Sequence, residues 1–198
     1  MRLILATRNP GKVAELQSRL EGLGVDLLSA TEVDGAPEVD EDRDTLRGNA
    51  EKKARALFDH TGRPSLADDT GLEVNALHGA PGVRSARFAG PDADDSANRA
   101  HLLSRLGEAT DRTARFRTVL AHVDATGVQF FDGVCEGEIL REETGTGGFG
   151  YDALFVPADG EGRTFAEMDG DEKNRISHRG RALDAFAAWL AITRPAAP

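Results

Sequence analysis

The chain has 198 residues, of which 39% are hydrophobic and 29% are charged, and its formal net charge is −10. This size and composition predict one globular domain over 1–198, and the charge argues against DNA or RNA as a partner. The N-terminal stretch MRLILATRNPGK has too short an apolar run for a signal peptide or a membrane span, so we expect a cytoplasmic protein. Cys135 is the single cysteine of the sequence, which excludes an internal disulfide and a multi-cysteine metal site.

The first half of the chain alternates strand and helix patterns. The apolar run RLILAT (2–7) predicts a buried strand. Asn9 then predicts a helix cap, with Pro10 at the first helical position. Apolar residues at helical spacing continue this helix and a glycine ends it, namely Val13, Leu16, Leu20, Leu23 and Gly24. Next come a strand, an acidic loop, a helix and a short strand, at 25–30, 34–44, 45–60 and 65–69 respectively.

In the second half the predicted strands follow one another directly. After a helix over 94–106, the alternating sequence TARFRTVLAHVDATGVQFFDGVCEGEILRE predicts a long hairpin over 113–142 that turns at 125–127. The last helix is predicted to start at Ser177, and its apolar face carries Leu183, Phe186 and Leu190. Together the two halves predict an α/β fold with a mixed sheet.

The stretch GTGGFGYD (145–152) raises the question of a dinucleotide site, because its first six residues fit G-x-G-x-x-G. That pattern binds a pyrophosphate only where a helix follows the glycines and offers its free amide groups. Here the chain continues as YDALFVP, an apolar stretch that ends in Pro157 and favours a strand. We therefore reject the dinucleotide interpretation and expect another use for the glycines.

The residues TRNPGK (7–12) lie where the first strand meets the first helix. Such a junction gathers free backbone amides, Lys12 adds a positive charge, and Gly11 lets a ligand approach the backbone. This arrangement suits a polyphosphate, although the Walker pattern G-x-x-x-x-G-K-[ST] is absent. A well-capped helix with an exposed lysine fits the same residues.

Two carboxylates, Asp68 and Asp69, end the predicted short strand. Neighbouring strand residues point to opposite faces, so we expect one of them to be structural and the other to bind a metal or take a proton. A turn at Asp-Thr-Gly that caps backbone amides is the alternative. If a carboxylate of the acidic loop met Asp69, the pair would make a magnesium site completed by water and substrate phosphates. A solvated acidic loop is the other interpretation.

Basic and aromatic residues near the C-terminal third are further candidates. Lys173, His178 and Arg179 lie around the predicted start of the last helix, where cations oppose the helix dipole and favour a bound electron-rich group. Exposed basic residues screened by solvent are the alternative. Phe149 and Tyr151 lie on the glycine-bearing loop, where a ring could stack on a nucleobase or be buried in the core.

Five motifs occur in one order along nearly the whole chain: T-x-N-x-x-K at 7–12, ADDTGL at 67–72, APGVRSARFAG at 80–90, GTGGFGYD at 145–152 and EKNRISHRG at 172–180. With this set the chain resembles the non-canonical purine nucleoside triphosphate pyrophosphatases, the ITP/XTP pyrophosphatase or Ham1-like family. The resemblance implies an elongated mixed sheet flanked by helices, two lobes with a nucleotide in the cleft between them, and a homodimer.

The resemblance also implies roles for individual residues. Asp69 would be the catalytic carboxylate and would bind Mg²⁺ together with Glu41. The triphosphate would be held by the junction of the first strand and helix, that is Thr7, Arg8, Asn9, Pro10, Gly11 and Lys12. The remaining substrate contacts would come from Thr70, from the loop residues Phe149, Gly150, Tyr151 and Asp152, and from the base readers Lys173, His178 and Arg179.

The implied activity is Mg²⁺-dependent hydrolysis of triphosphates with a 6-oxo purine, such as ITP, dITP or XTP, to the monophosphate and pyrophosphate. One position departs from the family pattern: where relatives have F-x-E-N-A, this chain has Leu46-Arg47-Gly48-Asn49-Ala50. Gly48 removes a carboxylate near the metal region, which leaves open whether Glu41 and Asp69 are the only protein ligands of the magnesium ion. The alternatives are a related house-cleaning pyrophosphatase for other modified nucleotides and a catalytically weakened nucleotide-binding sensor. No membrane partner is expected.

Overall fold

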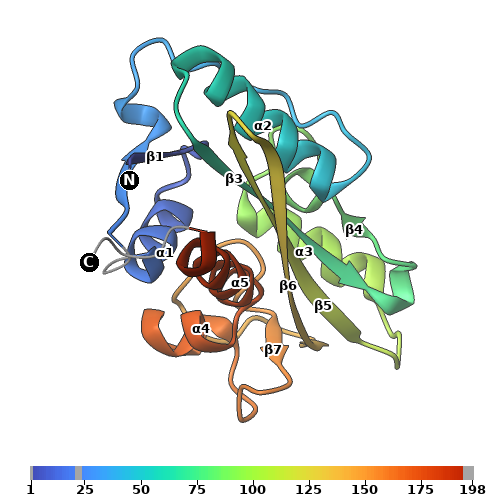
Figure 1. Cartoon of the computed structure of the whole chain (residues 1–198). Helices are drawn as coiled ribbons and strands as arrows, with labels where there is room; N and C mark the ends of the chain where they lie inside the picture. Colours follow the sequence, from blue (N-terminus) through green and yellow to red (C-terminus); the bar gives the residue numbers. More distant parts are fainter. Residues whose placement is uncertain (1, 21–23, 194–198) are drawn as a thin grey trace. The chain divides into compact units, whose positions relative to one another are not determined.

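The computed structural model describes residues 2–20 and 24–193 (Figure 1). Within these residues one sheet has seven strands in the order β2-β1-β3-β5-β6-β7, with β4 paired to β3. The strands are β1 (Arg2–Leu5), β2 (Asp26–Ser29), β3 (Ser65–Val74), β4 (Pro81–Gly82), β5 (Thr113–Asp124), β6 (Gly127–Ile139) and β7 (Phe155–Pro157). β1 pairs in parallel with β2 and β3, whereas β4 and β7 run antiparallel to β3 and β6. The predicted mixed sheet is confirmed.

The helices begin where the sequence provides caps. They are α1 (Pro10–Leu20), α2 (Leu46–Thr61), α3 (Asp95–Leu106), α4 (Gly170–Ile176) and α5 (His178–Thr193). Thr45 and Asp94 cap α2 and α3, since their side chains accept N–H bonds from Gly48 and Ala97. Leu23, which we predicted in the first helix, lies outside the described residues. None of the helices in the described part of the chain is long and apolar enough to cross a membrane.

The residue contacts divide the chain into two compact units. The first comprises the described residues of 1–69, 118–133 and 179–198, and the second comprises 70–117 and 134–178. Strands β3, β5 and β6 each contribute residues to both units.

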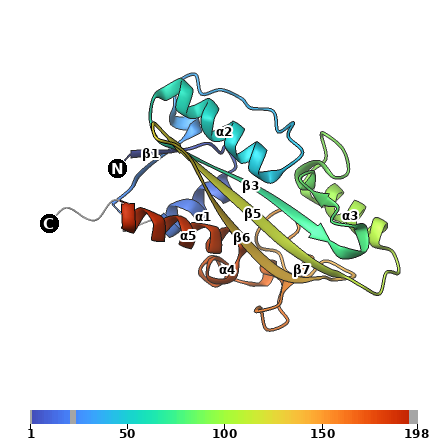
Figure 2. The same cartoon turned by 45° about the vertical axis from the view of Figure 1, so that its right-hand side comes forward.

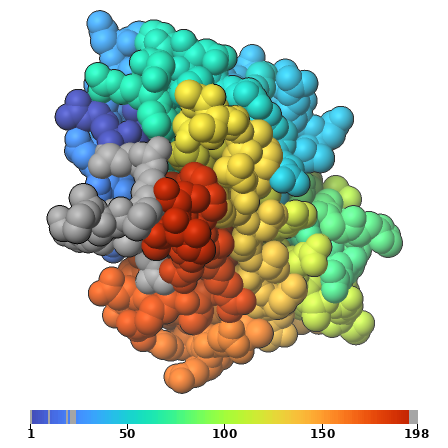
Figure 3. Space-filling view, viewed as in Figure 1, coloured from blue at the N-terminus to red at the C-terminus, as the bar shows by residue number. Residues whose placement is uncertain are grey.

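The first unit has helices on both faces of its sheet. Alternate strand residues Leu3, Leu5, Leu66 and Leu120 pack with α1 and α5, and the intervening Ile4, Ala67 and Ala121 pack with α2. Figure 2 accordingly shows α2 on one side of β1 and α1 and α5 on the other. As predicted, Leu183, Phe186 and Leu190 of α5 are buried, while the opposite side of this helix reaches the surface (Figure 3).

The second unit has a core of its own around the aromatic side chains that follow the glycine-bearing loop. Phe155 of β7 and Phe165 of the short helix η4 (Phe165–Glu167) are fully buried, and both rings contact Phe116 of β5. Leu102 and Leu106 of α3 complete this cluster.

In this region one predicted strand is too long and one helix was not predicted. The expected strand over YDALFVP is limited to its last three residues, because 151–154 form turns. The last helix, α5, begins at His178, directly after Ser177, as predicted, but the short helix α4 before it was not predicted, and Ser177 is the C-cap of that helix.

Candidate functional site

Asp68 and Asp69 lie in the middle of β3, because the strand continues to Val74. The expectation that the strand ends at Asp69, and with it the alternative of an Asp-Thr-Gly turn, is therefore wrong. Pairing of Leu72 with Gly82 of β4 keeps this part of the chain extended, and Thr70 is a half-buried strand residue. As predicted for neighbouring strand residues, the two carboxylates contact different elements: Asp68 contacts α1 and α5, and Asp69 contacts α2.

Asp68 is the centre of a buried ion-pair network. Its Oδ2 accepts hydrogen bonds from Nε and Nη2 of Arg179, both at 3.2 Å, and Nζ of Lys12 lies 3.1 Å away. Arg179 also donates to the carboxylate of Glu15 on α1. Burial alone would raise the pKa of Asp68, but Lys12 and Arg179 outweigh it and hold this pKa well below its usual range. Asp68 therefore stays ionised and connects β3 to α1 and α5, which is the structural role expected of one of the two carboxylates.

Asp69 and Glu41 share one lysine. Nζ of Lys53 on α2 lies 2.5 Å from Oε1 of Glu41 and 3.4 Å from Oδ1 of Asp69. Asn49 donates to the other oxygen of Asp69 at 3.1 Å. Burial raises the pKa of Asp69, and Glu41 adds to the rise although Lys53 opposes it. Burial would lower the pKa of Lys53, but Asp69, Asp68 and Glu41 outweigh it and raise this pKa, so the ammonium stays charged between the carboxylates.

This pair of carboxylates has the chemistry of a divalent-cation site with few protein ligands. Glu41 and Asp69 already share a cation, Lys53, which shows that positive charge is stabilised at this place. Within the described residues, no three His, Cys, Asp or Glu side chains are grouped to hold a metal. A divalent ion here would take two protein ligands and complete its shell with water and phosphate oxygens, as Mg²⁺ commonly does.

Sequence reasoning missed Asn49 and Lys53. They are one turn apart on α2 and lie among the buried positions Leu46, Ala50, Ala54 and Leu57. Lys53 is only 12% exposed. A polar pair inside the apolar stripe of a helix was the available signal, since a lysine is rarely buried without a charged partner.

The junction of β1 and α1 is a capped helix start. Oδ1 of Asn9 accepts the N–H groups of Gly11 at 2.9 Å and Lys12 at 3.2 Å, and Oγ1 of Thr7 accepts the N–H of Asn9 at 3.3 Å. Pro10 is the first residue of α1. The predicted cap is confirmed.

Two basic side chains leave this junction in different directions. Arg8 donates to the carboxylate of Glu38 at 3.0 Å and to the carbonyl of Ala36 at 3.1 Å, so it connects the junction to the acidic loop. Lys12 is half-buried and paired with Asp68, so it is not the exposed lysine of the alternative interpretation.

In the second unit the glycines of GTGGFGYD allow close packing. A Cβ atom on Gly145 would lie 2.7 Å from the carbonyl carbon of Ala166, and one on Gly147 would lie 2.9 Å from the carbonyl oxygen. At Gly148, where φ is +74°, a Cβ atom would collide with the carboxylate of Asp152. The glycines therefore let the loop lie directly on the backbone of η4 and on its own aspartate.

Phe149 is oriented by the buried pair of Asp152 and Lys173. Oδ2 of Asp152 accepts the N–H of Phe149 at 2.8 Å and a hydrogen bond from Nζ of Lys173, also at 2.8 Å. The same Nζ lies 4.5 Å from the centre of the Phe149 ring. Since Phe149 is only half-buried, its ring retains a surface on which a base could stack.

Tyr151 belongs to the core instead. Its ring is 4% exposed and packs in the cluster around Phe155, and its hydroxyl donates to the carbonyl of Ser85 at 2.8 Å. Of the two interpretations for the aromatic residues, burial holds for the ring of Tyr151.

Lys173, His178 and Arg179 are not a solvated basic cluster. Their exposed fractions are 6%, 3% and 2%. Lys173 lies in the last turn of α4, where the helix dipole favours a cation. The ring of His178 stacks on Phe116 with centroids 4.5 Å apart. The interpretation as exposed, solvent-screened charges is wrong; Lys173 and His178 belong to the second unit, and Arg179 to the first.

A sequence profile of the Ham1 family matches residues 3–189. The chain belongs to this family. The dITP/XTP pyrophosphatase of Desulforamulus reducens is 54% identical over 186 residues, which cover 92% of each chain. A HAM1 protein from Coxiella burnetii has a solved structure with a TM-score of 0.89 and 40% identity, over 97% of this chain and 99% of its own. For the Staphylococcus aureus Ham1 protein the TM-score is 0.88 and the identity 33%, over 98% and 100% of the two chains.

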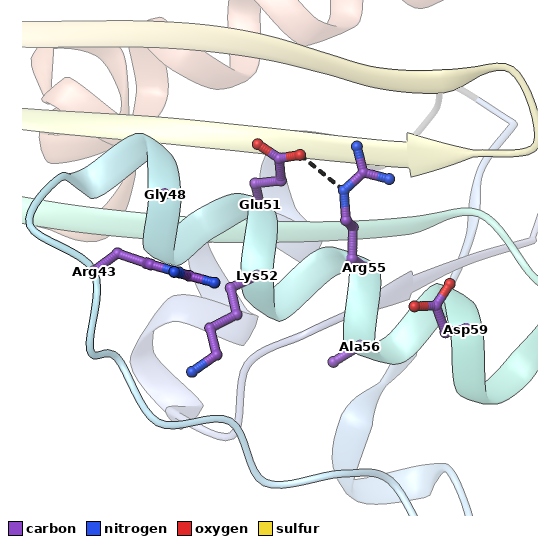
Figure 4. A pocket seen from close by; sticks show the side chains of 7 residues that line it. All are labelled: Arg43, Gly48, Glu51, Lys52, Arg55, Ala56 and Asp59. Atoms are coloured by element: carbon purple, nitrogen blue, oxygen red, sulfur yellow. Dashed lines mark hydrogen bonds and ion pairs between the residues drawn. The ribbon is translucent and has the colours of Figure 1, made fainter.

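Gly48, where this chain departs from the Ham1 pattern F-x-E-N-A, lies beside the N-cap of α2. A Cβ atom there would lie 3.0 Å from Cβ of Arg43 and 3.1 Å from Oγ1 of Thr45. Figure 4 shows this position in the first turn of α2, beside an open cavity of about 520 Å³ whose lining includes Arg43, Glu51, Lys52 and Arg55. Because Thr45 is the N-cap, a glutamate at 48 would form a capping box with it. A carboxylate at this position would therefore have a role in the helix cap.

Proposed function

We propose that this Ham1-family chain is a metal-dependent pyrophosphatase that hydrolyses dITP, ITP or XTP to the monophosphate and pyrophosphate. The observation that carries the proposal is the arrangement of Glu41, Lys53 and Asp69, together with the ionised Asp68 beside Asp69 in β3 and its partner Lys12 on α1. Family membership and the name of the Desulforamulus reducens relative support the same activity.

The phosphates would bind at the start of α1. Lys12 supplies positive charge there, and the dipole of α1 favours an anion at its N-terminus, although the N–H groups of Gly11 and Lys12 are already capped by Asn9. Thr7, Asn9 and Gly11 would complete this contact surface. The charge that develops on the leaving pyrophosphate would be stabilised by these groups.

Asp69 would act on the attacking water. In the reaction, the water oxygen bonds to the α-phosphorus while the bond from that phosphorus to the pyrophosphate oxygen breaks, and Asp69 accepts the water proton. Its raised pKa makes it a stronger base than an ordinary aspartate, and Lys53 and Asn49 fix both of its oxygens. Mg²⁺, held by Glu41 and Asp69, would neutralise phosphate charge when bound.

The base would be read by basic and aromatic side chains. Hypoxanthine and xanthine carry an acceptor oxygen at the 6-position, whereas adenine carries a donor amino group. Lys173 and His178 are donors, and Phe149 offers a stacking surface. Arg179 is also proposed to contact the base. Its hydrogen bonds to Asp68 and Glu15 in addition anchor α5 to β3 and α1. Donors that meet the amino group of adenine remain unpaired, which disfavours ATP.

The proposal also includes Mg²⁺ as the ion, a homodimer, one two-lobed domain and a cytoplasmic location. They rest on the family resemblance and on the use of a nucleotide substrate. Light scattering after size-exclusion chromatography measures the dimer directly, and activity in magnesium-free buffer with added chelator measures the metal requirement.

The test is product analysis in ¹⁸O-labelled water. Incubation with dITP and Mg²⁺ should yield dIMP and pyrophosphate, with the label in dIMP, because water attacks the α-phosphorus. Label in pyrophosphate would place the attack at the β-phosphorus, and dIDP with orthophosphate would contradict the proposal. The panel dITP, ITP, XTP, GTP and ATP, extended to modified pyrimidine nucleotides, separates this activity from a house-cleaning enzyme for other bases.

A nucleotide-binding sensor without catalysis remains the alternative from another class. Its support is the missing carboxylate at Gly48, and a capping role for a carboxylate at this position in α2 would weaken that support. Nucleotide binding without any product would establish the sensor.

A further inference from the structure

Helix α3 contacts the loop that carries Phe149 through two side chains one turn apart. Oδ2 of Asp95 accepts the N–H of Gly150 at 2.7 Å, and Nη1 of Arg99 donates to the carbonyl of the same glycine at 2.9 Å. Residues four apart share one side of a helix, so a single face of α3 holds both polar backbone groups of Gly150.

Arg99 also joins the two arms of this loop. Its Nε lies 3.0 Å from Oε2 of Glu143, at the start of the loop, while Nη1 binds Gly150 at the end. The side chain of Arg99 is 18% exposed and that of Glu143 is 41% exposed, so the arginine is mostly buried while its carboxylate partner lies at the surface. One guanidinium therefore closes the loop across 143–150.

The helix that provides these contacts is itself well anchored. Asp94 caps it by accepting the N–H of Ala97 at 2.7 Å, and the buried Asn98 binds the backbone of Ala86 and Ala89. Leu102 and Leu106 extend from the same helix into the core of the second unit. α3 is thus a rigid support for the loop.

The backbone on both sides of Phe149 is held by carboxylates. Its own N–H donates to Asp152 at 2.8 Å, and the next N–H, that of Gly150, donates to Asp95 at 2.7 Å. Each bond fixes one of the two peptide planes that flank Phe149, so together they fix the direction in which its side chain leaves the backbone. Gly150 has a φ of +61°, and the bonds from Asp95 and Arg99 stabilise this left-handed conformation.

We propose that Asp95 and Arg99 are positioning residues that preorganise Phe149 for the nucleobase, an inference that rests on the proposed function. Neither side chain is assigned to substrate contact. Their loss would lower the fraction of molecules in which the ring has the binding-competent direction, and apparent affinity falls with that fraction.

The test compares steady-state kinetics on dITP with amide exchange of the loop. Asp95→Ala and Arg99→Ala should each raise KM by about tenfold and leave kcat within about threefold, since each removes a charge-assisted hydrogen bond to Gly150, and Arg99→Ala also removes the ion pair with Glu143. Amide exchange over 145–152 should become faster while the rest of the unit stays protected. Asp95→Asn should retain most of the affinity because its amide oxygen still accepts a hydrogen bond. Arg105→Ala, an exposed arginine of the same helix, is the matched control and should match the parent.

A parent-like KM in both alanine variants would overturn the proposal, as would a fall in kcat at constant KM. If the parent releases no pyrophosphate from dITP, the proposed function fails, and calorimetric Kd values for dITP then replace KM. The same tenfold weakening supports the positioning role in that case, and equal Kd values or absence of dITP binding contradicts it.

Discussion

Tyr151 is the single tyrosine of the chain, which makes its titration directly observable. Burial, and secondly the charge of Asp95, raise its pKa above the ordinary value of about 10. Above that pH the unfolded chain loses the phenol proton while the folded chain keeps it. The unfolded state then binds fewer protons, so the free energy of unfolding should fall by up to about 1.4 kcal/mol per pH unit.

Two measurements check this prediction. Tyrosinate absorbance of the folded protein should remain low at pH values where free tyrosine is ionised. Between about pH 10 and about pH 11, Tyr151→Phe should lose less stability than the parent, because it lacks the titrating group. An ordinary titration near pH 10 in the folded protein would show that the hydroxyl is accessible.

Replacing Asp69 with asparagine tests the proposed base. The change preserves shape but removes the charge shared with Glu41 and Lys53, and kcat on dITP should fall by about 10²–10⁴-fold. Asp59→Asn on the exposed end of α2 is the control and should keep parental activity. Activity of Asp69→Asn within a few-fold of the parent would move the chemistry to another group.

Arg179→Ala separates base reading from anchoring. The variant leaves Asp68 and Glu15 without this cation, and loss of one partner of a buried pair costs about 3–5 kcal/mol of stability. If Arg179 also reads the base, activity on dITP should fall more than activity on dATP, so the ratio of dITP activity to dATP activity should decrease. Denaturant unfolding and both activities measure the two effects; an unchanged ratio would leave only the anchoring task.

For single residues, the sequence predicts those features that depend on one helix or strand alone. The strand period was sufficient to separate Asp68 from Asp69, and Asn9 was recognisable as a cap. Lys53 was not recognisable, because its partners come from a loop at 41 and a strand at 69 that only the fold brings to α2. For the same reason, burial of Tyr151 depends on Ser85, far away in sequence.

Among the elements, α2 offers a clear test of the capping interpretation of position 48. Gly48→Glu should raise the free energy of unfolding by about 0.5–1 kcal/mol, since glycine disfavours a helix interior and glutamate completes the box with Thr45. Arg43, which is exposed, has to move by a few tenths of an ångström. Thermal unfolding measures the gain, and kcat on dITP should stay within about twofold.

Gly48→Ala is the matched control for this prediction, because it supplies helix propensity without the carboxylate. A several-fold rise of activity in Gly48→Glu, but not in Gly48→Ala, would show that a carboxylate at position 48 acts near the metal.

Most elements follow from local patterns, and the errors have specific causes. α4 carries a capping box of Asp169 and Glu172, a signal that was present in the sequence but was overlooked beside the longer pattern of α5. The predicted strand ended too early, and the alternative of a turn at Asp-Thr-Gly fails, because pairing with β4 keeps Thr70-Gly71 in β3. Here tertiary contacts overrode the local preference of glycine.

For the molecule as a whole, strands shared by the two units predict cooperative unfolding. β3 alone contributes Ser65–Asp69 to one unit and Thr70–Val74 to the other, so neither unit keeps its sheet when the other unfolds. The chain has one tryptophan, Trp189 in the first unit, and one tyrosine, Tyr151 in the second. Thermal transitions followed by tryptophan fluorescence and by tyrosine absorbance should coincide. Two separate midpoints would show that the units unfold independently.

The contact between the glycine loop and the backbone of η4 limits how this enzyme could be redesigned. In a mutant library aimed at new base preferences, substitutions at Gly145, Gly147 and Gly148 would mostly disrupt the loop, because any side chain there collides with backbone or with Asp152. Diversity is better placed at Phe149, whose partly exposed ring lies on a loop that those three glycines keep in place.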